Sequence, residues 1–124
     1  MAWTGKILRI DLSNRSFWIE DTEPYIDKFI GGKGINVKIL YDEVGPEVKP
    51  FDPENRLCLG PGVLAGTPAP THSRMKISSI SPHGLLNNSG IGGHIAAAIK
   101  KAGFDNVTIQ GKSESMIYLL IRPD

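Results

Sequence analysis

The stretch Lys6–Glu20, with the sequence KILRIDLSNRSFWIE, decides how this chain begins to fold. Leu8, Ile10 and Leu12 alternate with charged residues, which is the period of a strand with one buried face. Residues 13–15, Ser-Asn-Arg, favour a turn, so the residues after them can return as an antiparallel partner. The chain therefore begins with a predicted β-hairpin.

Beyond the hairpin, the sequence alternates between short helical and short extended segments. Apolar residues at helical spacing predict helices, and alternating apolar residues or short apolar runs predict strands. The predicted helices are 24–30, 34–44 and 95–102, and the predicted strands are 56–59, 75–80, 107–109 and 116–121, with a brief one at 85–86. A length of 124 residues suits one domain, 1–124. We therefore expect a strand-rich α+β domain with about three short helices.

The composition excludes several classes of protein. The net charge is +1 and Lys and Arg are scattered, so we expect no broad basic face and no binding to nucleic acid. No segment has the length of a membrane span, and the N-terminus lacks the apolar core of a signal peptide, so we expect a cytoplasmic protein without membrane contact. Cys58 alone cannot bind an iron–sulfur cluster, and its apolar neighbours favour a buried structural thiol.

A glycine-rich segment before the helix 95–102 is the best candidate for a binding site. Residues 87–93 read Asn-Asn-Ser-Gly-Ile-Gly-Gly. A glycine-rich turn at the start of a helix leaves backbone N–H groups free at the positive end of the helix dipole, which suits a phosphate or another anion. Arg74, in the same middle part of the chain, offers a cation for a planar anionic or heteroaromatic ligand. The alternative, that the glycines serve only the packing of the helix entry, stays open.

Other motifs match known sites only in part. Gly111-Lys112-Ser113 resembles the end of a P-loop, but Asn106 stands where that motif needs glycine. Gly31-Gly32-Lys33-Gly34 follows a predicted helix, whereas a dinucleotide-binding fingerprint follows a strand. The three histidines lack the spacing of a metal motif, and Ser73 and Ser89 lack the partners of an activated nucleophile. We therefore assign no catalytic residue and no metal ligand to this chain.

Motifs spread over nearly the whole chain carry a family resemblance. In chain order they are Gly5–Leu12, Phe29–Gly34, Leu40–Val44, Pro53–Leu57, Gly60–Thr71, Ser81-Pro82, Gly92-Gly93, Lys101–Asp105 and Gly111-Lys112. Together they resemble the N-terminal domain of the aldehyde:ferredoxin oxidoreductase family of tungsten, sometimes molybdenum, pterin enzymes. Any one of these motifs is weak, whereas the whole series in this order is specific.

The resemblance implies a cofactor site. In the family, this domain forms a two-sheet base under a bis-pterin tungsten cofactor whose phosphates are bridged by magnesium. Arg74 matches the arginine that lies between the pterin and a [4Fe–4S] cluster. Gly92 and Gly93 match the segment that holds pterin and phosphate. Asn88 or, in an alternative alignment, Gly90 stands where the family has its asparagine, and either backbone carbonyl could contact the magnesium.

The resemblance also implies a reaction for the complete enzyme, which would oxidise an aldehyde with water to a carboxylic acid and pass two electrons through the cluster to ferredoxin. The cluster cysteines and the remaining pterin ligands of the family lie in later domains. We therefore expect this chain alone to be inactive and without bound cofactor. Its expected partners are those domains, ferredoxin in the complete enzyme, and a second copy that covers exposed apolar surface. The alternative is a non-catalytic stand-alone module or subunit that binds a pterin or phosphate or assembles with partner proteins.

Overall fold

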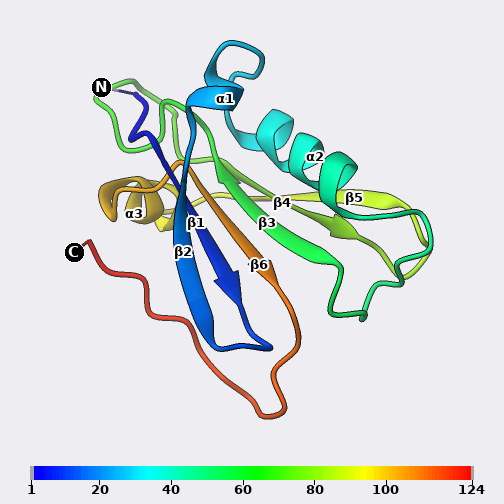
Figure 1. Cartoon of the computed structure of the whole chain (residues 1–124). Helices are drawn as coiled ribbons and strands as arrows, with labels where there is room; N and C mark the ends of the chain where they lie inside the picture. Colours follow the sequence, from blue (N-terminus) through cyan, green and yellow to red (C-terminus); the bar gives the residue numbers. More distant parts are fainter. Residues whose placement is uncertain (1, 124) are drawn as a thin grey trace.

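The computed structural model describes residues 2–123 and has an α+β architecture with three helices, as expected. The elements in chain order are β1 (Lys6–Asp11), β2 (Ser16–Asp21), α1 (Glu23–Ile26), α2 (Gly32–Glu43), β3 (Arg56–Pro61), β4 (Met75–Ile80), β5 (Leu86–Ile91), α3 (Ile95–Lys101) and β6 (Asn106–Gln110) (Figure 1). The predicted hairpin is confirmed as β1 and β2, which pair antiparallel.

All six strands belong to one sheet, in the order β2-β1-β6-β3-β4-β5. The expected base of two sheets is therefore not what residues 2–123 form. The reason is the position of β3, which pairs antiparallel with β6 on one side and with β4 on the other and so joins the two halves. The pairing of β1 with β6 is parallel, and it brings together strands from opposite ends of the chain.

The two faces of the sheet carry separate apolar clusters, because successive residues of a strand point to opposite faces. Ile35 and Ile39 lie one turn apart on α2 and both face the sheet. Their cluster consists of Ile7, Ile35, Ile39, Leu40 and Cys58. The burial predicted for Cys58 is thus confirmed. The opposite face, which α3 covers in part, carries a cluster of Leu8, Ile10, Ala65, Met75, Ala96, Ile99, Phe104 and Val107.

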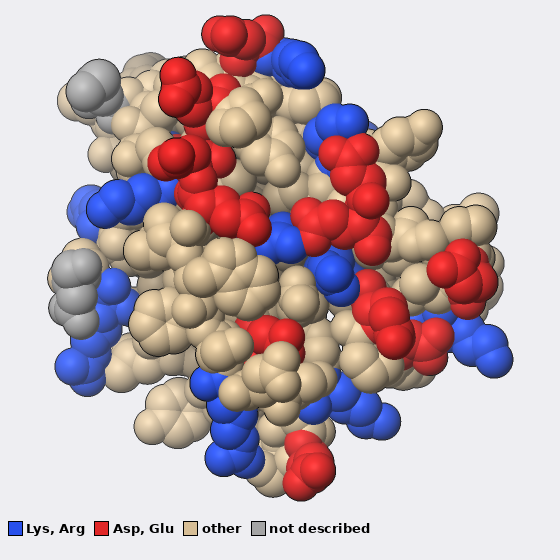
Figure 2. All heavy atoms as spheres, viewed as in Figure 1, with Lys and Arg blue, Asp and Glu red and all other residues tan. Residues whose placement is uncertain are grey.

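Charged side chains of both signs are interspersed over the face shown in Figure 2. Several of the charges are paired within the chain. Arg9 contacts Glu43, and the Oε1 atom of Glu43 also lies 3.3 Å from Nε of Arg56. Lys38 and Asp42 form a pair of 2.8 Å along α2. This mixture agrees with the expectation that the face in view carries no broad basic area. Within residues 2–123, none of the helices combines the length and the hydrophobicity that crossing a membrane requires.

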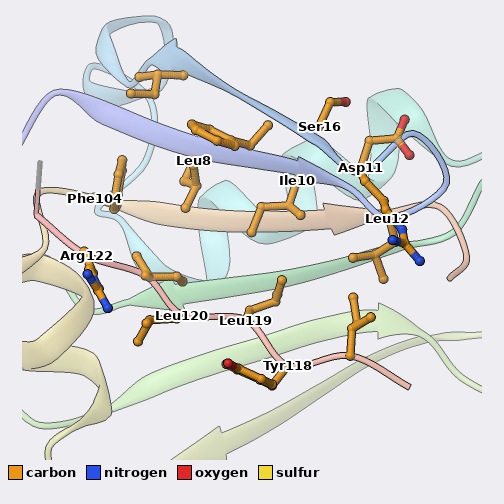
Figure 3. Close-up of a pocket in the computed structure, with 15 residues that line it drawn as sticks. Leu8, Ile10, Asp11, Leu12, Ser16, Phe104, Tyr118, Leu119, Leu120 and Arg122 are labelled. Carbon is orange, nitrogen blue, oxygen red and sulfur yellow. The ribbon is translucent and has the colours of Figure 1, made fainter. Parts of the chain in front are cut away.

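The segment 116–121, which we expected to form a strand, is irregular and has no strand partner among the described residues. It crosses the same face of the sheet as α3, and Figure 3 shows Leu8 and Ile10 of β1 pointing toward it. A cavity of about 500 Å³ lies between the segment and the sheet. The strand prediction is wrong, because the segment lies over the face of β1, whose two edges are taken by β2 and β6, and does not pair with the free edge of β2. Met116 and Tyr118 consequently remain 101% and 88% exposed.

Candidate functional site

An open pocket of about 380 Å³ lies at the N-terminal end of α2, on the face of the sheet that this helix covers. It is lined by glycine backbone and by basic side chains, and no acidic residue lines it. The lining residues are Ile30, Gly31, Gly32, Lys33, Gly34, Gly60, Gly62, Arg74 and Lys76. The combination of three cationic side chains with exposed backbone is suited to an anion.

The glycines of this pocket allow α2 to begin directly against the end of β3. Gly31 and Gly32 have φ angles of 62° and 50°, which side chains other than glycine rarely adopt. Gly31 also forms an isolated bridge with Gly62. A Cβ built on Gly60 would lie 2.6 Å from both the backbone oxygen of Gly32 and Oδ1 of Asn36. The helix start and the strand end can therefore approach this closely only because residue 60 is glycine.

The start of α2 is electrostatically favourable for an anion. The helix has 12 residues, and its first turn contains Lys33 but no acidic side chain. Backbone N–H groups at a helix N-terminus carry a partial positive charge, and nothing acidic offsets it here. The pocket therefore lies where both the helix dipole and the neighbouring side chains favour a negatively charged group.

Arg74 and Lys76 reach the pocket from the start of β4, and Gly90 of β5 leaves space beside them. Lys76 and Gly90 are paired across the two strands. A Cβ built on Gly90 would lie 3.3 Å from Nζ of Lys76 and 3.6 Å from Nη1 of Arg74. A side chain at this position would fill the space next to both cations. Glycine therefore keeps the two positive groups accessible.

Asn88 lies two residues before Gly90 on β5 and so on the same face of the sheet. Its side chain is half-buried and accepts a hydrogen bond from Oγ of Ser78, at 2.5 Å. The structure thus brings together three of the residues expected to form a site, namely Arg74, Asn88 and Gly90. Their neighbourhood is the α2 end of β4 and β5.

Gly92 and Gly93 do not line this pocket. They lie between β5 and α3, are exposed, and have no atom within 4 Å of a built Cβ. The expected glycine-rich turn over residues 87–93 is also wrong in part, because Leu86–Ile91 form β5 and pair with β4. The following helix, α3, has only seven residues and no side-chain hydrogen bond at its N-cap, His94.

The sequence reasoning missed Lys76 and the glycines around α2. Gly31–Gly34 were set aside because they follow a helix, yet they matter through contact with residues 60–62 rather than through a strand before them. One usable signal was present in the strand 75–80. Lys76 follows Arg74 by two residues, the spacing that places side chains on one face of a strand.

The donors at this pocket fit an organic anion such as a pterin phosphate better than they fit a metal ion. Arg and Lys side chains donate hydrogen bonds and bind phosphates, but they do not ligate metals. Among residues 2–123, no group of three or more His, Cys, Asp or Glu side chains is placed to hold a metal ion. Burial raises the pKa of the Cys58 thiol to about 11, so this sulfur stays protonated at neutral pH.

Comparison with known proteins identifies the family of this chain. The family described as "Aldehyde ferredoxin oxidoreductase, N-terminal domain" matches residues 7–124. The tungsten-containing aldehyde ferredoxin oxidoreductase of Pyrococcus abyssi is 37% identical over 125 residues, which are 99% of this chain and 21% of that protein. The corresponding protein of Thermococcus kodakarensis is 35% identical over 97% of this chain and 20% of its own length.

Two further relatives have other functions. The aliphatic sulfonate oxidoreductase, WOR-like subunit, of Pyrococcus furiosus is 33% identical over 99% of this chain. A solved structure of the active site complex BamBC of benzoyl coenzyme A reductase, in complex with 1,5-dienoyl-CoA, superposes with a TM-score of 0.95 at 42% identity. The superposition covers 98% of this chain and 19% of the benzoyl coenzyme A reductase chain. The chain spans about a fifth of the length of these relatives.

The match over almost all of the chain, the high structural similarity and the identities above 30% agree with one another. The resemblance inferred from the motifs is confirmed, and with it the similarity to an N-terminal oxidoreductase domain. This chain belongs to the aldehyde ferredoxin oxidoreductase family and corresponds to its N-terminal domain.

Proposed function

We propose that this chain, as one domain over residues 1–124, is the N-terminal platform of an aldehyde:ferredoxin oxidoreductase-like enzyme and binds the pterin and phosphate parts of its tungstopterin. The observation that carries the proposal is the pocket at the start of α2, which has three basic side chains, glycine backbone and no acidic residue. The tungsten-containing relatives support tungsten as the metal, with molybdenum as the alternative.

Each basic side chain has a role in this proposal. Arg74 presents a planar guanidinium, which can stack on a pterin ring or donate a pair of parallel hydrogen bonds. Lys76 and Lys33 neutralise phosphate charge, and the first backbone N–H groups of α2 donate to phosphate oxygens. When bound, the cofactor supplies the two-electron redox chemistry. The residues of this chain bind and orient it and balance its charge.

The other predicted contacts lie along β5 and beyond it. Gly92 and Gly93 are exposed, with open space at the Cα of each, so their backbone can approach a ligand closely. We infer that they contact the cofactor farther from Arg74. The backbone carbonyl of Asn88 or Gly90 is the proposed contact to a bridging magnesium ion. β5 is an edge strand of the sheet, so one side of its backbone has no strand partner within residues 2–123.

The complete protein would oxidise an aldehyde with water to a carboxylic acid. Two electrons would leave through a [4Fe–4S] cluster to ferredoxin, and two protons would be released. The relatives are about five times as long as this chain, which supports further domains that carry the cluster and the rest of the cofactor site. We propose that the enzyme acts in the cytoplasm and that the described part alone is inactive.

We also infer self-association through the apolar segment 116–121. Met116 and Tyr118 are almost fully exposed, and Leu120 is 64% exposed. Exposed apolar side chains that follow one another in this way mark a surface that another layer covers. A second copy of the chain is the proposed partner.

The alternative is a non-catalytic module or subunit that binds a pterin or phosphate or assembles with partner proteins. One relative is named as a WOR-like subunit and another belongs to the BamBC complex, which supports only the part of this alternative that concerns assembly with partner proteins. The two functions differ in one measurable property. The enzyme reduces ferredoxin or a redox dye when supplied with an aldehyde, and the module does not.

Substitution of the two site cations tests the proposal. Arg74→Ala and Lys76→Ala in the full-length protein should each lower the tungsten and pterin content after anaerobic purification. Lys38→Ala is the matched control, because Lys38 lies on α2 outside the pocket and pairs with Asp42. Full metal and pterin occupancy in both site variants would remove the pocket from the cofactor site.

A further inference from the structure

A chain of buried polar side chains crosses the sheet and ends at Asn88. The donors and acceptors follow one another in a single direction. Thr108 Oγ1 donates to Asn106 Oδ1 (2.8 Å), Asn106 Nδ2 to Asn36 Oδ1 (2.7 Å), Asn36 Nδ2 to Ser78 Oγ (3.0 Å) and Ser78 Oγ to Asn88 Oδ1 (2.5 Å). The first four residues are fully buried, and the chain connects β6, α2, β4 and β5.

Asn36 determines the direction of this chain. Its Nδ2 also lies 3.2 Å from the backbone oxygen of Cys58 and 3.0 Å from that of Lys76. Backbone oxygens only accept hydrogen bonds, so the amide nitrogen of Asn36 must face them and its Oδ1 must face Asn106. Exchanging the two atoms would place the oxygen of Asn36 against two other oxygens.

Ser78 continues the donor-to-acceptor order of this hydrogen-bonded chain toward Asn88. Its hydroxyl accepts from Asn36 and keeps one hydrogen, which it can donate to Asn88. In the structure, the atom of Asn88 that faces Ser78 is the oxygen Oδ1, at 2.5 Å. The nitrogen Nδ2 of Asn88 is turned away from Ser78, and no residue between 2 and 123 accepts a hydrogen bond from it.

The same network positions the cation beside Asn88. Asn36 binds the backbone oxygen of Lys76, and Lys76 is paired with Gly90 while Ser78 is paired with Asn88. Lys76 and Asn88 are thus diagonal neighbours on one face of β4 and β5, within reach of a long side chain. Asn88 does not itself line the pocket, but it lies on the same face as Lys76, which does.

We propose that Ser78, oriented by Asn36, is a positioning residue that turns the Asn88 amide so that it presents hydrogen-bond donors to the ligand. This inference rests on the proposed function and adds to it which end of the Asn88 amide, the nitrogen, faces the ligand. The face formed by Arg74, Lys76 and Asn88 offers donors only, so it recognises an acceptor such as a phosphate oxygen. Because Oδ1 of Asn88 accepts the hydrogen bond of Ser78, the nitrogen of the amide and not its oxygen is directed to the ligand in this proposal.

Replacement of the donor by an acceptor tests this polarity. The probe is inorganic pyrophosphate, titrated calorimetrically into the full-length protein prepared without cofactor. Asn88→Asp should weaken pyrophosphate binding by about tenfold or more, because a charge-assisted hydrogen bond is lost and a negative charge faces the ligand. Asn87→Asp is the matched control. It adds the same charge one residue away on the opposite face, and it should change the affinity by less than about twofold, as expected for screened charges.

Removal of the positioning hydroxyl tests the role of Ser78. Ser78→Ala should weaken pyrophosphate binding several-fold, and Ser78→Thr, which keeps a hydroxyl, should restore it. A purely structural role would lower the stability of Ser78→Ala without a matching change in affinity. If Ser78→Ala does not fold, the comparison of Asn88→Asp with Asn87→Asp still decides the matter.

The outcomes separate this inference from the proposed function. Pyrophosphate binding that is weakened in Arg74→Ala but unchanged in Ser78→Ala and Asn88→Asp would contradict the proposed orientation of the Asn88 amide. It would still support the pocket as the anion site. Absence of pyrophosphate binding by the unsubstituted protein would overturn both. Weaker binding in Arg74→Ala, Ser78→Ala and Asn88→Asp, with the control unchanged, is the result that we expect.

Discussion

Lys76 and Gly90 face each other across β4 and β5, and a Cβ on Gly90 would lie 3.3 Å from the ammonium nitrogen of Lys76. This pairing explains how residues of two separate strands form the proposed site. Arg74 and Lys76 lie on one face because strand residues alternate, and they stay accessible because the opposing residue has no side chain. Gly90 thus leaves open space beside the two cations, which the proposed ligand would occupy.

The first prediction concerns that space. Gly90→Val should weaken pyrophosphate binding by about tenfold, since its side chain would occupy the room beside Lys76 and Arg74 and displace a charge-assisted contact. Gly92→Val is the comparison variant, because no atom lies within 4 Å of a Cβ at Gly92 and its proposed contact with the cofactor lies farther from Arg74. Calorimetric titration of both variants compares the two glycines. A larger loss of pyrophosphate affinity in Gly92→Val would indicate that the phosphate binds at the segment before α3.

The second prediction concerns the contact between α2 and β3. Gly60→Ala should lower the free energy of unfolding by roughly 1–3 kcal/mol, the usual cost of overpacking. The added Cβ would lie 2.6 Å from the backbone oxygen of Gly32, which has little freedom to move. Denaturant unfolding measures the effect. Gly62→Ala, where the nearest atom is 3.4 Å away, is the milder comparison, and equal stability of the two variants would contradict the tight contact.

The third prediction concerns the buried ion pair of Lys100 in α3 with Asp105 before β6. Their side chains are 6% and 1% exposed, and Asp105 also accepts hydrogen bonds from the backbone of Thr4 and Gly5 and from the hydroxyl of Thr22. Asp105→Asn should cost roughly 3–5 kcal/mol of stability, because it leaves the ammonium buried without its counter-charge. Thermal unfolding at neutral pH measures this loss. Asp42→Asn, on the exposed face of α2, should cost less than about 1 kcal/mol.

The same ion pair gives a pH dependence. Burial alone would raise the pKa of Asp105, but the hydrogen bond from Lys100, the Thr4 backbone N–H and the Lys100 charge together bring the pKa below the value of 3.8 for a free side chain. The folded pKa is thus lower than the unfolded one, so the stabilisation is complete above 3.8 and is lost as the pH falls through the folded pKa. Stability should therefore decline below about pH 4, and this part of the decline should be absent in Asp105→Asn. An identical acid profile for both proteins would argue against the pair.

The fourth prediction concerns self-association. Tyr118→Glu should shift the protein toward the monomer in light scattering at micromolar to millimolar concentrations, because a charge replaces an apolar side chain that is 88% exposed. Ser115→Glu adds the same charge at an exposed position outside the apolar segment and should leave the association unchanged. An unsubstituted protein that stays monomeric over this whole range would contradict the proposed second copy.

Local pattern predicted the elements whose formation depends on nearby residues. The alternation of Leu8, Ile10 and Leu12 gave the hairpin, and apolar spacing gave α2 and α3 to within two residues at most ends. β5 was predicted only as a brief strand at 85–86, because Asn87, Ser89 and Gly90 have low strand propensity, which the pairing with β4 overrides. The segment 116–121 has a strand-like pattern but pairs with no strand in the described part of the chain, although β2 and β5 each have a free edge.

The candidate site was predicted only in part, because some of its residues come together through long-range contacts. Arg74, Asn88 and Gly90 were found through their motifs, but Lys76 and Gly31–Gly34 join the site only when β3, β4 and α2 come together. Contacts between glycines 28 residues or more apart, such as Gly32 with Gly60, leave no local signal. The resemblance to a family supplied the cofactor class, which neither composition nor spacing could provide.

A structure of the full-length protein with its cofactor tests the central claim most directly. We expect phosphate oxygens within hydrogen-bonding distance, about 3 Å, of Lys76 Nζ and of the first backbone N–H groups of α2, with the guanidinium of Arg74 against the pterin. A cofactor whose phosphates contact only Gly92 and Gly93, with Lys76 and the start of α2 facing solvent or another domain, would contradict it.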